Sequence, residues 1–264
     1  MKQKINFLII KILSIIIPIT ILNKLELIIQ NSLGKGAYMS LENMSVKNEV
    51  KTLNKLLKED VNIIFDIGSN YGIYTDELLK YYPDAKYFLF EPLKEPYKYL
   101  VDKYKSNLNI KIFNYAVSDQ NYSSLIYYDK VGTGAASLVK RKLDHFGVKF
   151  DKVEEVELIS LNNLFENDFN NKSFKINICK IDIEGHELNV LNSIKNNFEK
   201  FGLIQFEIGG CNIDSRTYFQ DFWYLLKDNF DIYRVGPSGP ILINEYKELD
   251  ETFVMTNYMA VNKN

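Results

Sequence analysis

The sequence predicts an α/β fold with a mostly parallel sheet of seven strands, helices on both faces and an antiparallel closing strand. From about residue 45, short apolar runs alternate with longer amphipathic stretches, which is typical of strands joined by helices. The last two apolar runs are separated by "PSGP" and a polar stretch instead of a helix, which predicts the antiparallel end. No tandem repeat or low-complexity linker indicates a second folded domain.

The first half reads as βαβαβ, with strands at 62–68, 86–92 and 109–119 and helices at 74–82 and 93–107. A short strand beginning at 123, a Gly- and Ala-rich loop, an alternating strand at 152–160 and a short helix at 160–167 follow. The second half resumes the alternation with strands at 176–185 and 202–210 and helices at 186–200 and 215–230. The antiparallel pair is expected at 231–236 and 252–262.

Composition places the chain among ordinary globular proteins. Its 264 residues are 46% hydrophobic and 25% charged, enough for one sizeable core. A formal net charge of -2 gives no general attraction to nucleic acid, so we do not expect a nucleic-acid partner. Two cysteines, Cys179 and Cys211, supply no disulfide framework, and we predict a reducing, cytoplasmic location.

Residues 1–44 form a separate apolar, Lys-containing helical segment, and residues 45–264 form the predicted domain. Lys11 interrupts the apolar run and Pro18 breaks a helix there, so no clean spanning segment results. No small-residue cleavage site follows, which argues against a secretory signal. We interpret residues 1–30 as a peripheral contact with an anionic membrane surface at the inner face of the membrane. Packing on the domain, dimerisation and an uncleaved signal anchor are the alternatives, and the oligomeric state is left open.

The stretch "DIGSNYG" follows the first strand and carries two glycines four residues apart, Gly68 and Gly72. It lacks the spacing of the dinucleotide fingerprint G-x-G-x-x-G, which argues against a dehydrogenase. Such a turn can cradle a carboxylate, and Asp66 before it is placed to meet an ammonium group. Glu91, a little over 20 residues further on, stands where an acid accepts both hydroxyls of a ribose. A nucleoside that carries an amino acid fits this set, and S-adenosylmethionine is such a ligand.

Three further residues of the turn belong to the predicted cofactor site, but each also has a purely structural explanation. Ser69 and Asn70 are residue types that form turns, and Thr75 can satisfy its own helix backbone.

The motifs "IIFDIGSNYGIYT", "FLFEP", "AVSD", "KIDIEGHELNVLNS" and "IQFEIGG" occur in an order and spacing that resemble the FkbM family of S-adenosylmethionine-dependent methyltransferases. The resemblance covers roughly residues 45–262 and implies a Rossmann-like class I methyltransferase fold. It also implies O-methylation, commonly of glycan sugars or natural products. By the same resemblance, Pro92 of "FLFEP" and Ala116 and Val117 of "AVSD" join the cofactor site. Asn162 departs from the family, which often has Asp there.

O-methyl transfer requires an aligned hydroxyl and a base that removes its proton. The candidates are four residues after the later strands: Asp182, Glu184, His186 and Glu207. Asp182 also belongs to the predicted cofactor site because it should face the reactive end of the cofactor. The acids and His186 could instead serve the N-terminus of the following helix. A divalent metal held by Asp182, Glu207 and a nearby amide is an alternative that we do not favour.

We therefore predict an S-adenosylmethionine-dependent O-methyltransferase that acts on a saccharide hydroxyl, which a lipid could carry. The loop from 129 to 146 is expected to lie over the pocket, where Lys140 and Arg141 could meet an acidic acceptor. One alternative is a nucleotide-sugar or dinucleotide-dependent oxidoreductase built on the same sheet. Another is a catalytically inactive nucleoside-binding subunit.

Overall fold

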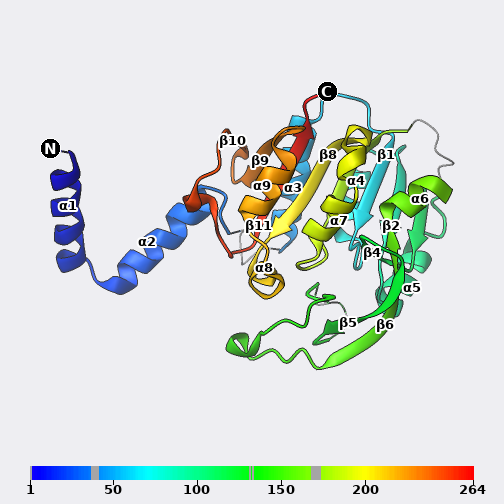
Figure 1. Cartoon of the computed structure of the whole chain (residues 1–264), viewed down its shortest axis with the longest axis horizontal. Helices are drawn as coiled ribbons and strands as arrows, with labels where there is room; N and C mark the ends of the chain where they lie inside the picture. Colours follow the sequence, from blue (N-terminus) through cyan, green and yellow to red (C-terminus); the bar gives the residue numbers. More distant parts are fainter. Residues whose placement is uncertain (1, 37–41, 131, 133, 168–173) are drawn as a thin grey trace.

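The computed structural model describes residues 2–36, 42–130, 132, 134–167 and 174–264. An α/β domain carries a two-helix arm at its N-terminus (Figure 1). Residues 37–41, next to the predicted boundary at residue 44, lie outside the described residues.

The main sheet has the strand order β10-β9-β11-β8-β7-β1-β2-β3. Strands β3, β2, β1, β7 and β8 are parallel, and β11 lies antiparallel between β8 and β9. The strands are β1 (Ile63–Ile67), β2 (Lys86–Phe90), β3 (Ile110–Phe113), β7 (Ile176–Ile181), β8 (Phe201–Ile208), β9 (Phe230–Gly236), β10 (Gly239–Ile243) and β11 (Thr256–Asn262). The fold class is confirmed, with β10 as an addition to the seven predicted strands. Its "GPILI" begins at Gly239, within the "PSGP" stretch, and pairs with β9 as an edge hairpin.

Helices cover both faces of this sheet and form two separate cores. One face packs on α3 (Glu42–Leu56), α4 (Ile73–Leu79) and α5 (Lys94–Tyr104), and the other on α6 (Leu161–Asn167), α7 (Glu187–Ser193) and α9 (Phe219–Leu226). Side chains alternate between the faces, so that Ile64 of β1 points to the first core and Phe65 to the second. The predicted helix at 186–200 is divided into α7 and the 3-10 helix η2 (Lys195–Lys200). The predicted helix at 215–230 is shorter, because only α9 forms there, and α8 (Gly210–Ser215) precedes it.

A second, three-stranded sheet has the order β4-β6-β5. Its strands are β4 (Ala116–Ser118), β5 (Tyr122–Tyr128) and β6 (Lys152–Ser160). The predicted strand at 109–119 is therefore two strands in two sheets. The Asn114 side chain lies at the break and donates to the carbonyl oxygens of Glu91 and Pro92 at 2.9 and 2.8 Å, which fixes the turn between β3 and β4. The 3-10 helix η1 (Asp144–Phe146) precedes β6, and η3 (Glu248–Asp250) precedes β11.

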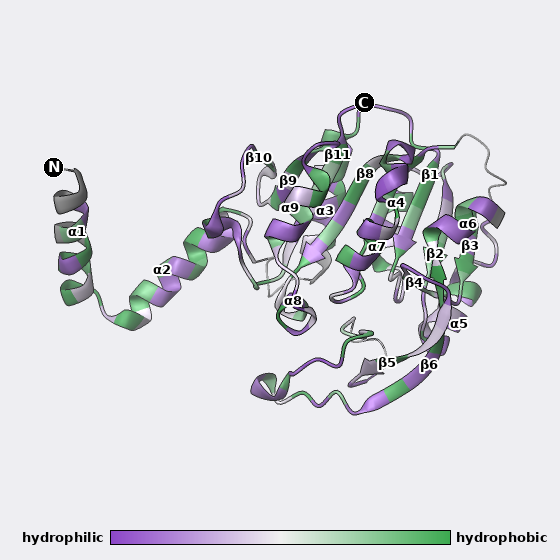
Figure 2. Cartoon of the chain, in the orientation of Figure 1, coloured by the Kyte–Doolittle hydropathy of each residue, from purple (hydrophilic) through white to green (hydrophobic). Residues whose placement is uncertain are grey.

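The arm consists of α1 (Lys2–Ile16) and α2 (Ile19–Ser32), with the break at Pro18. It extends away from the domain (Figure 1), with hydrophobic and hydrophilic residues mixed along both helices (Figure 2), and many of its large apolar side chains are exposed. Within the described residues, none of the helices is both long and apolar enough to cross a membrane.

Candidate active site

A cavity opens at the carboxyl ends of β1, β2 and β7, with the small sheet and the loop after β5 as its outer wall. We call it the main cavity; it holds about 640 Å³ of empty space, counting its open mouth. Predicted cofactor residues supply one side, and apolar residues such as Phe90, Ile126 and Leu138 supply much of the rest. The predicted residues that line it are Gly68, Asn70, Glu91, Pro92, Ala116, Val117, Asp182 and Glu184. A largely apolar pocket with a few placed polar groups is typical of a cofactor site.

Contacts within the protein leave no room for a side chain at Gly68 or Gly72. Gly68 has φ +84°, and a Cβ there would overlap the carbonyl oxygen of Asp182. Gly72 has φ +75° at the start of α4, where a Cβ would lie 2.6 Å from the Tyr104 hydroxyl. Gly68 lines the main cavity, whereas Gly72 contacts α5 behind it. The groups that approach these two glycines closely are therefore the Asp182 backbone and the Tyr104 side chain.

Asp66 and Thr75 lie behind the glycine turn, fully buried. The Thr75 hydroxyl donates to Asp66 Oδ2 at 2.6 Å, and Ser69 Oγ donates to the Asp66 carbonyl oxygen at 2.6 Å. Within the described residues, Asp66 Oδ1 has no hydrogen-bond donor. Burial raises the pKa of this carboxyl, although the charge of Lys180 opposes the change. Asp66 is not among the described residues that line the main cavity or its neighbours, so this acceptor without a donor lies behind the predicted cofactor space.

Glu91 directly follows β2 and lines the main cavity, as a ribose-binding acid should. Its two carboxylate oxygens accept the backbone N–H groups of Asn70 and Leu93, both at 2.9 Å. Each oxygen keeps a second lone pair, so the carboxylate can still accept hydroxyls from a ligand. Burial raises the pKa of Glu91 to about 7, against the effect of these two backbone donors.

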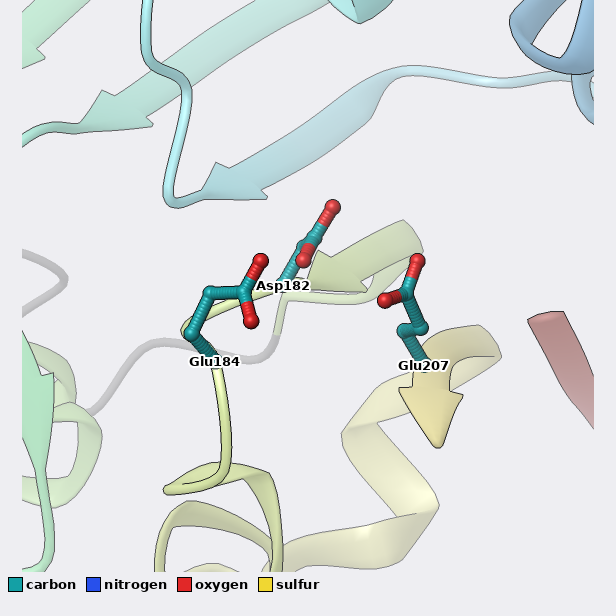
Figure 3. Close-up of side chains that lie close together, drawn as sticks. All are labelled: Asp182, Glu184 and Glu207. Carbon is teal, nitrogen blue, oxygen red and sulfur yellow. The ribbon is translucent and has the colours of Figure 1, made fainter. Parts of the chain in front are cut away.

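Three acids converge where the main cavity meets the end of β8. Asp182 and Glu184 come from the turn after β7 and Glu207 from β8, and their side chains approach a common space (Figure 3). One carboxylate oxygen from each lies within 4.8 Å of the others. This is the spacing that a divalent cation would require, and the sequence could not show it.

Two of these acids already have protein cations as partners. Lys180 Nζ lies 2.7 Å from Asp182 Oδ2, and Arg141 pairs with Glu184. Arg141 thus contacts the cluster, a contact the sequence did not suggest when it offered Arg141 to an acidic acceptor. Glu207 has no hydrogen bond or ion pair within the described part of the chain. Burial, followed by the charges of Asp182 and Glu184, raises its pKa well above the usual value.

The turn that presents Glu184 is held by several contacts. Glu184 has φ +57° and Gly185 φ +104°, an arrangement that reverses the chain before α7. The Glu187 carboxylate accepts the backbone N–H groups of Ile183 and Gly185, and Ser137 Oγ donates to the Glu184 carbonyl oxygen at 2.6 Å. Glu187 is thus structural, and Ser137 ties the loop after β5 to the acids.

His186 lies apart from the three acids. Its Nε2 is 2.8 Å from the hydroxyl of Ser118 at the end of β4, and burial lowers its pKa. His186 is not among the described residues that line the main cavity. Asn162, the departure from the family pattern, donates to the Ser193 carbonyl oxygen and so links α6 to α7.

A second cavity, which we call the adjoining cavity, holds about 1060 Å³ of empty space and, among the described residues, shares five lining residues with the main one: Gly68, Asn70, Gly132, Gly134 and Asp182. Most of its exposed lining surface is apolar, but several lining residues have polar side chains: Ser45, Glu49, Ser69, Asn70, Tyr71, Tyr74, Lys180, Asp182, Glu207 and Asn257. Hydrogen bonds behind it run from Tyr74 to Gln205 at 2.6 Å and from Gln205 to Glu49 and Asn257. The acid cluster therefore stands at the junction of two cavities.

Comparison with known families gives one decisive match. The Methyltransferase FkbM domain matches residues 66–232, which is more than half of the chain. The chain belongs to the FkbM methyltransferase family. The predicted family and fold class are thereby confirmed, and with them a methyltransferase that uses S-adenosylmethionine. Membership of this family also removes the oxidoreductase alternative.

Solved structures of methyltransferases are similar at low identity. Methyltransferase FkbM from Methylobacillus flagellatus is 14% identical, with 78% of this chain and 45% of that chain covered and a TM-score of 0.45. This chain therefore spans under half the length of that protein. An O-methyltransferase from Thermotoga maritima is 10% identical, covering 83% of this chain and 66% of that chain, with a TM-score of 0.40. TrmK from M. capricolum, solved with S-adenosylhomocysteine, is 14% identical, covering 80% of this chain and 67% of that chain, with a TM-score of 0.42. The comparison with curated proteins gave no match.

Lys180 is the main site residue that the sequence reasoning missed. It stands two residues before Asp182 in β7, and side chains two apart in a strand share a face. That spacing could have indicated the ion pair. Glu49, in contrast, comes from α3, and its approach to β8 depends on helix packing that no local motif reveals.

Cofactor binding by this FkbM methyltransferase should depend on pH through Glu91. The pKa of about 7 means that the carboxyl becomes protonated as the pH falls through 7, and a protonated carboxyl accepts ribose hydroxyls poorly. We expect calorimetry to show S-adenosylhomocysteine binding about tenfold more weakly at pH 6 than at pH 8. The Glu91→Gln variant should bind more weakly at both pH values and lose this dependence. Equal affinity of the native chain at both pH values would contradict the assignment.

Proposed function

We propose that this chain transfers the methyl group of S-adenosylmethionine to a hydroxyl oxygen on a sugar of a glycan or lipid-linked saccharide. The observation that carries the proposal is the position of Glu207, an acid without a partner in the described residues: it lines the adjoining cavity, close to Asp182, which lines both cavities. The main cavity has the residues to hold the cofactor, with Glu91 toward the ribose and Asp66 behind the turn. The adjoining cavity is left for the acceptor.

When bound, the cofactor supplies a methyl group on a sulfonium, so it is already activated toward a nucleophile. The chain must then bring the acceptor hydroxyl into line and remove its proton. We assign proton removal to the Glu207 carboxylate because Lys180 and Arg141 already neutralise its two neighbours. The hydroxyl oxygen bonds to the methyl carbon, the carbon–sulfur bond breaks, and the proton passes to Glu207. Burial, and after it the charges of Asp182 and Glu184, raises the pKa of Glu207 and so makes its carboxylate a stronger base.

A hydroxyl-rich acceptor is supported by the lining of the adjoining cavity. Hydroxyl, amide and carboxylate groups there can each bond a sugar hydroxyl, and the rings of Tyr71 and Tyr74 can contact a sugar face. An aliphatic acceptor would cover the Glu207 carboxylate without giving it a hydrogen-bond donor, which is costly for a charged group.

The proposal is tested by labelling. Incubation of the chain with S-adenosylmethionine labelled in the methyl group and with glycan and glycolipid fractions should give a labelled product. The label should survive mild alkali, which hydrolyses methyl esters but leaves methyl ethers intact, and should appear in a monosaccharide after acid hydrolysis. Label released by alkali, or found only in protein or nucleic acid, would contradict the proposal. Cofactor binding without any labelled product would favour the inactive-subunit alternative.

A further inference from the structure

The arm presents apolar side chains on every side. Neighbouring positions are exposed together, such as Ile15 and Ile16, with 74% and 71% of their surfaces exposed, and Leu27, Ile28 and Ile29 in α2. Successive residues of an α-helix lie about 100° apart, so these runs cover most of the circumference. A helix that packs against one protein partner needs only a one-sided stripe. Lipid acyl chains, in contrast, can contact all sides at once.

The arm is also positively charged. Its residues up to Ser32 include four lysines and one glutamate, a formal charge of +3, whereas the whole chain is -2. Lys11 and Lys24 are exposed, one on each helix. Long lysine side chains can keep their ammonium groups at a polar surface while the stem lies among apolar groups. This charge is complementary to anionic lipid headgroups.

The root of the arm is fixed to the domain. Buried Arg234 donates to the Leu33 carbonyl oxygen at 3.1 Å and pairs with Asp250 at 2.7 Å. Lys35 donates to the carbonyl oxygen of Leu249, whose side chain is 81% exposed. Leu249 thus extends the apolar surface of the arm onto the domain.

The same root reaches the adjoining cavity. The Gly36 N–H donates to Thr256 Oγ1 at 3.2 Å, and the neighbours of Thr256 in sequence, Met255 and Asn257, line that cavity. Ser45 and Glu49 also line both the adjoining cavity and the small hollow beneath the root. An arm inserted in a lipid surface would therefore hold the mouth of the adjoining cavity close to that surface.

We propose that the arm and Leu249 form a binding surface for anionic lipid bilayers, and that the acceptor reaches the adjoining cavity from the bilayer as a saccharide on a lipid anchor. The second part rests on the proposed function, because it requires that the adjoining cavity binds the acceptor. Each helix of the arm, with 15 and 14 residues, is about 22 Å long. That length suits insertion into one leaflet.

Co-sedimentation with vesicles tests whether the arm and Leu249 form a lipid-binding surface. The full chain should sediment with phosphatidylcholine vesicles that contain 30% phosphatidylglycerol and much less with phosphatidylcholine alone. The Lys11→Glu/Lys24→Glu variant should bind the anionic vesicles about 30-fold more weakly. Its matched control is Lys86→Glu/Lys98→Glu, the same change of charge at exposed lysines on the domain, which should bind like the native chain. A native chain that stays in the supernatant, or a dimer that Ile16→Ser/Ile28→Ser dissociates without any vesicle binding, would overturn the proposal.

The orientation of the domain on the bilayer is tested with a polarity-sensitive fluorophore attached to a single introduced cysteine. Cys179 and Cys211 are buried, so the label should react at the new position. A label at Leu249→Cys should shift to shorter wavelength on anionic vesicles and be quenched by spin-labelled lipids. The control is Leu108→Cys, 96% exposed beside β3 at the opposite edge of the main sheet, which should do neither. Equal responses at the two positions would contradict the orientation.

The lipid experiments and the methyl-transfer experiment can fail independently. Vesicle binding needs neither cofactor nor acceptor, so its failure leaves the proposed function standing. Vesicle binding by a chain that methylates no saccharide would instead reject the proposed function and, with it, the lipid-anchored acceptor.

Discussion

Replacing Glu207 by glutamine is expected to lower the rate of methyl transfer by about 10²- to 10⁴-fold at saturating cofactor and acceptor. Glutamine has nearly the same shape but cannot take up the proton of the attacking hydroxyl. Glu207 lines the adjoining cavity and not the main one, so the affinity for S-adenosylhomocysteine should change by less than about threefold. A steady-state assay with labelled methyl donor, combined with calorimetry, measures both quantities.

The pH profile gives this variant a second signature. The ionised form of Glu207 is the active base, and its pKa lies well above the ordinary value because of burial and of the negative charges of Asp182 and Glu184. The native rate at saturating cofactor should therefore fall as the pH falls through that raised pKa. The glutamine variant should lack this limb, because it has no proton to gain there. Saturation with cofactor separates this limb from the effect of Glu91 on binding.

Glu184→Gln is the matched control within the same cluster. Its carboxylate is held by Arg141, so we expect a smaller loss of rate than for Glu207→Gln. A large loss in Glu184→Gln or His186→Ala, with Glu207→Gln nearly unaffected, would move the base to that residue. Loss of activity in a chelator that Mg²⁺ restores would instead assign the three acids to a metal.

The parallel half of the fold could be predicted because local signals and global topology agree there. Strand β7 is buried at every position, and its sequence "INICKI" is apolar except at Asn177 and Lys180. The acids after the strands could also be identified, because parallel strands end at one edge of the sheet. Asp182, Glu184 and Glu91 are each found at the cavity that this rule anticipates.

Other features depend on contacts between distant residues, which a single sequence does not display. The division between β3 and β4 rests on Asn114 reaching back to the end of β2. His186 follows Glu184 by two residues, but the positive φ at Glu184 and Gly185 turns the chain so that His186 meets Ser118. The ion pair of Arg141 with Glu184 joins a long loop to the turn after β7. Residue type and spacing therefore identify the acids of the site but do not predict which side chains contact them.

Gly68→Ala is expected to destabilise the protein by about 2–5 kcal/mol, even without cofactor. About 1–2 kcal/mol comes from an L-residue in a left-handed conformation, and about 1–3 kcal/mol more from forcing a methyl group into a packed site. The neighbouring backbone cannot move aside easily, because the Gly68 and Asp182 N–H groups donate to the carbonyl oxygens of Phe90 and Ile67 at 2.9 and 3.0 Å. Urea unfolding of the cofactor-free chain measures the loss.

Gly147→Ala separates the two costs. Gly147 also has positive φ, +69°, but nothing lies within 4 Å of the position that a Cβ would take. We expect this variant to lose only about 1–2 kcal/mol, the conformational cost alone. Aggregation of Gly68→Ala beside soluble Gly147→Ala would agree with a collision inside the protein. If Gly68→Ala instead unfolds like the native chain and fails only to bind S-adenosylhomocysteine, then the cofactor, and not the carbonyl of Asp182, is what requires glycine at this position.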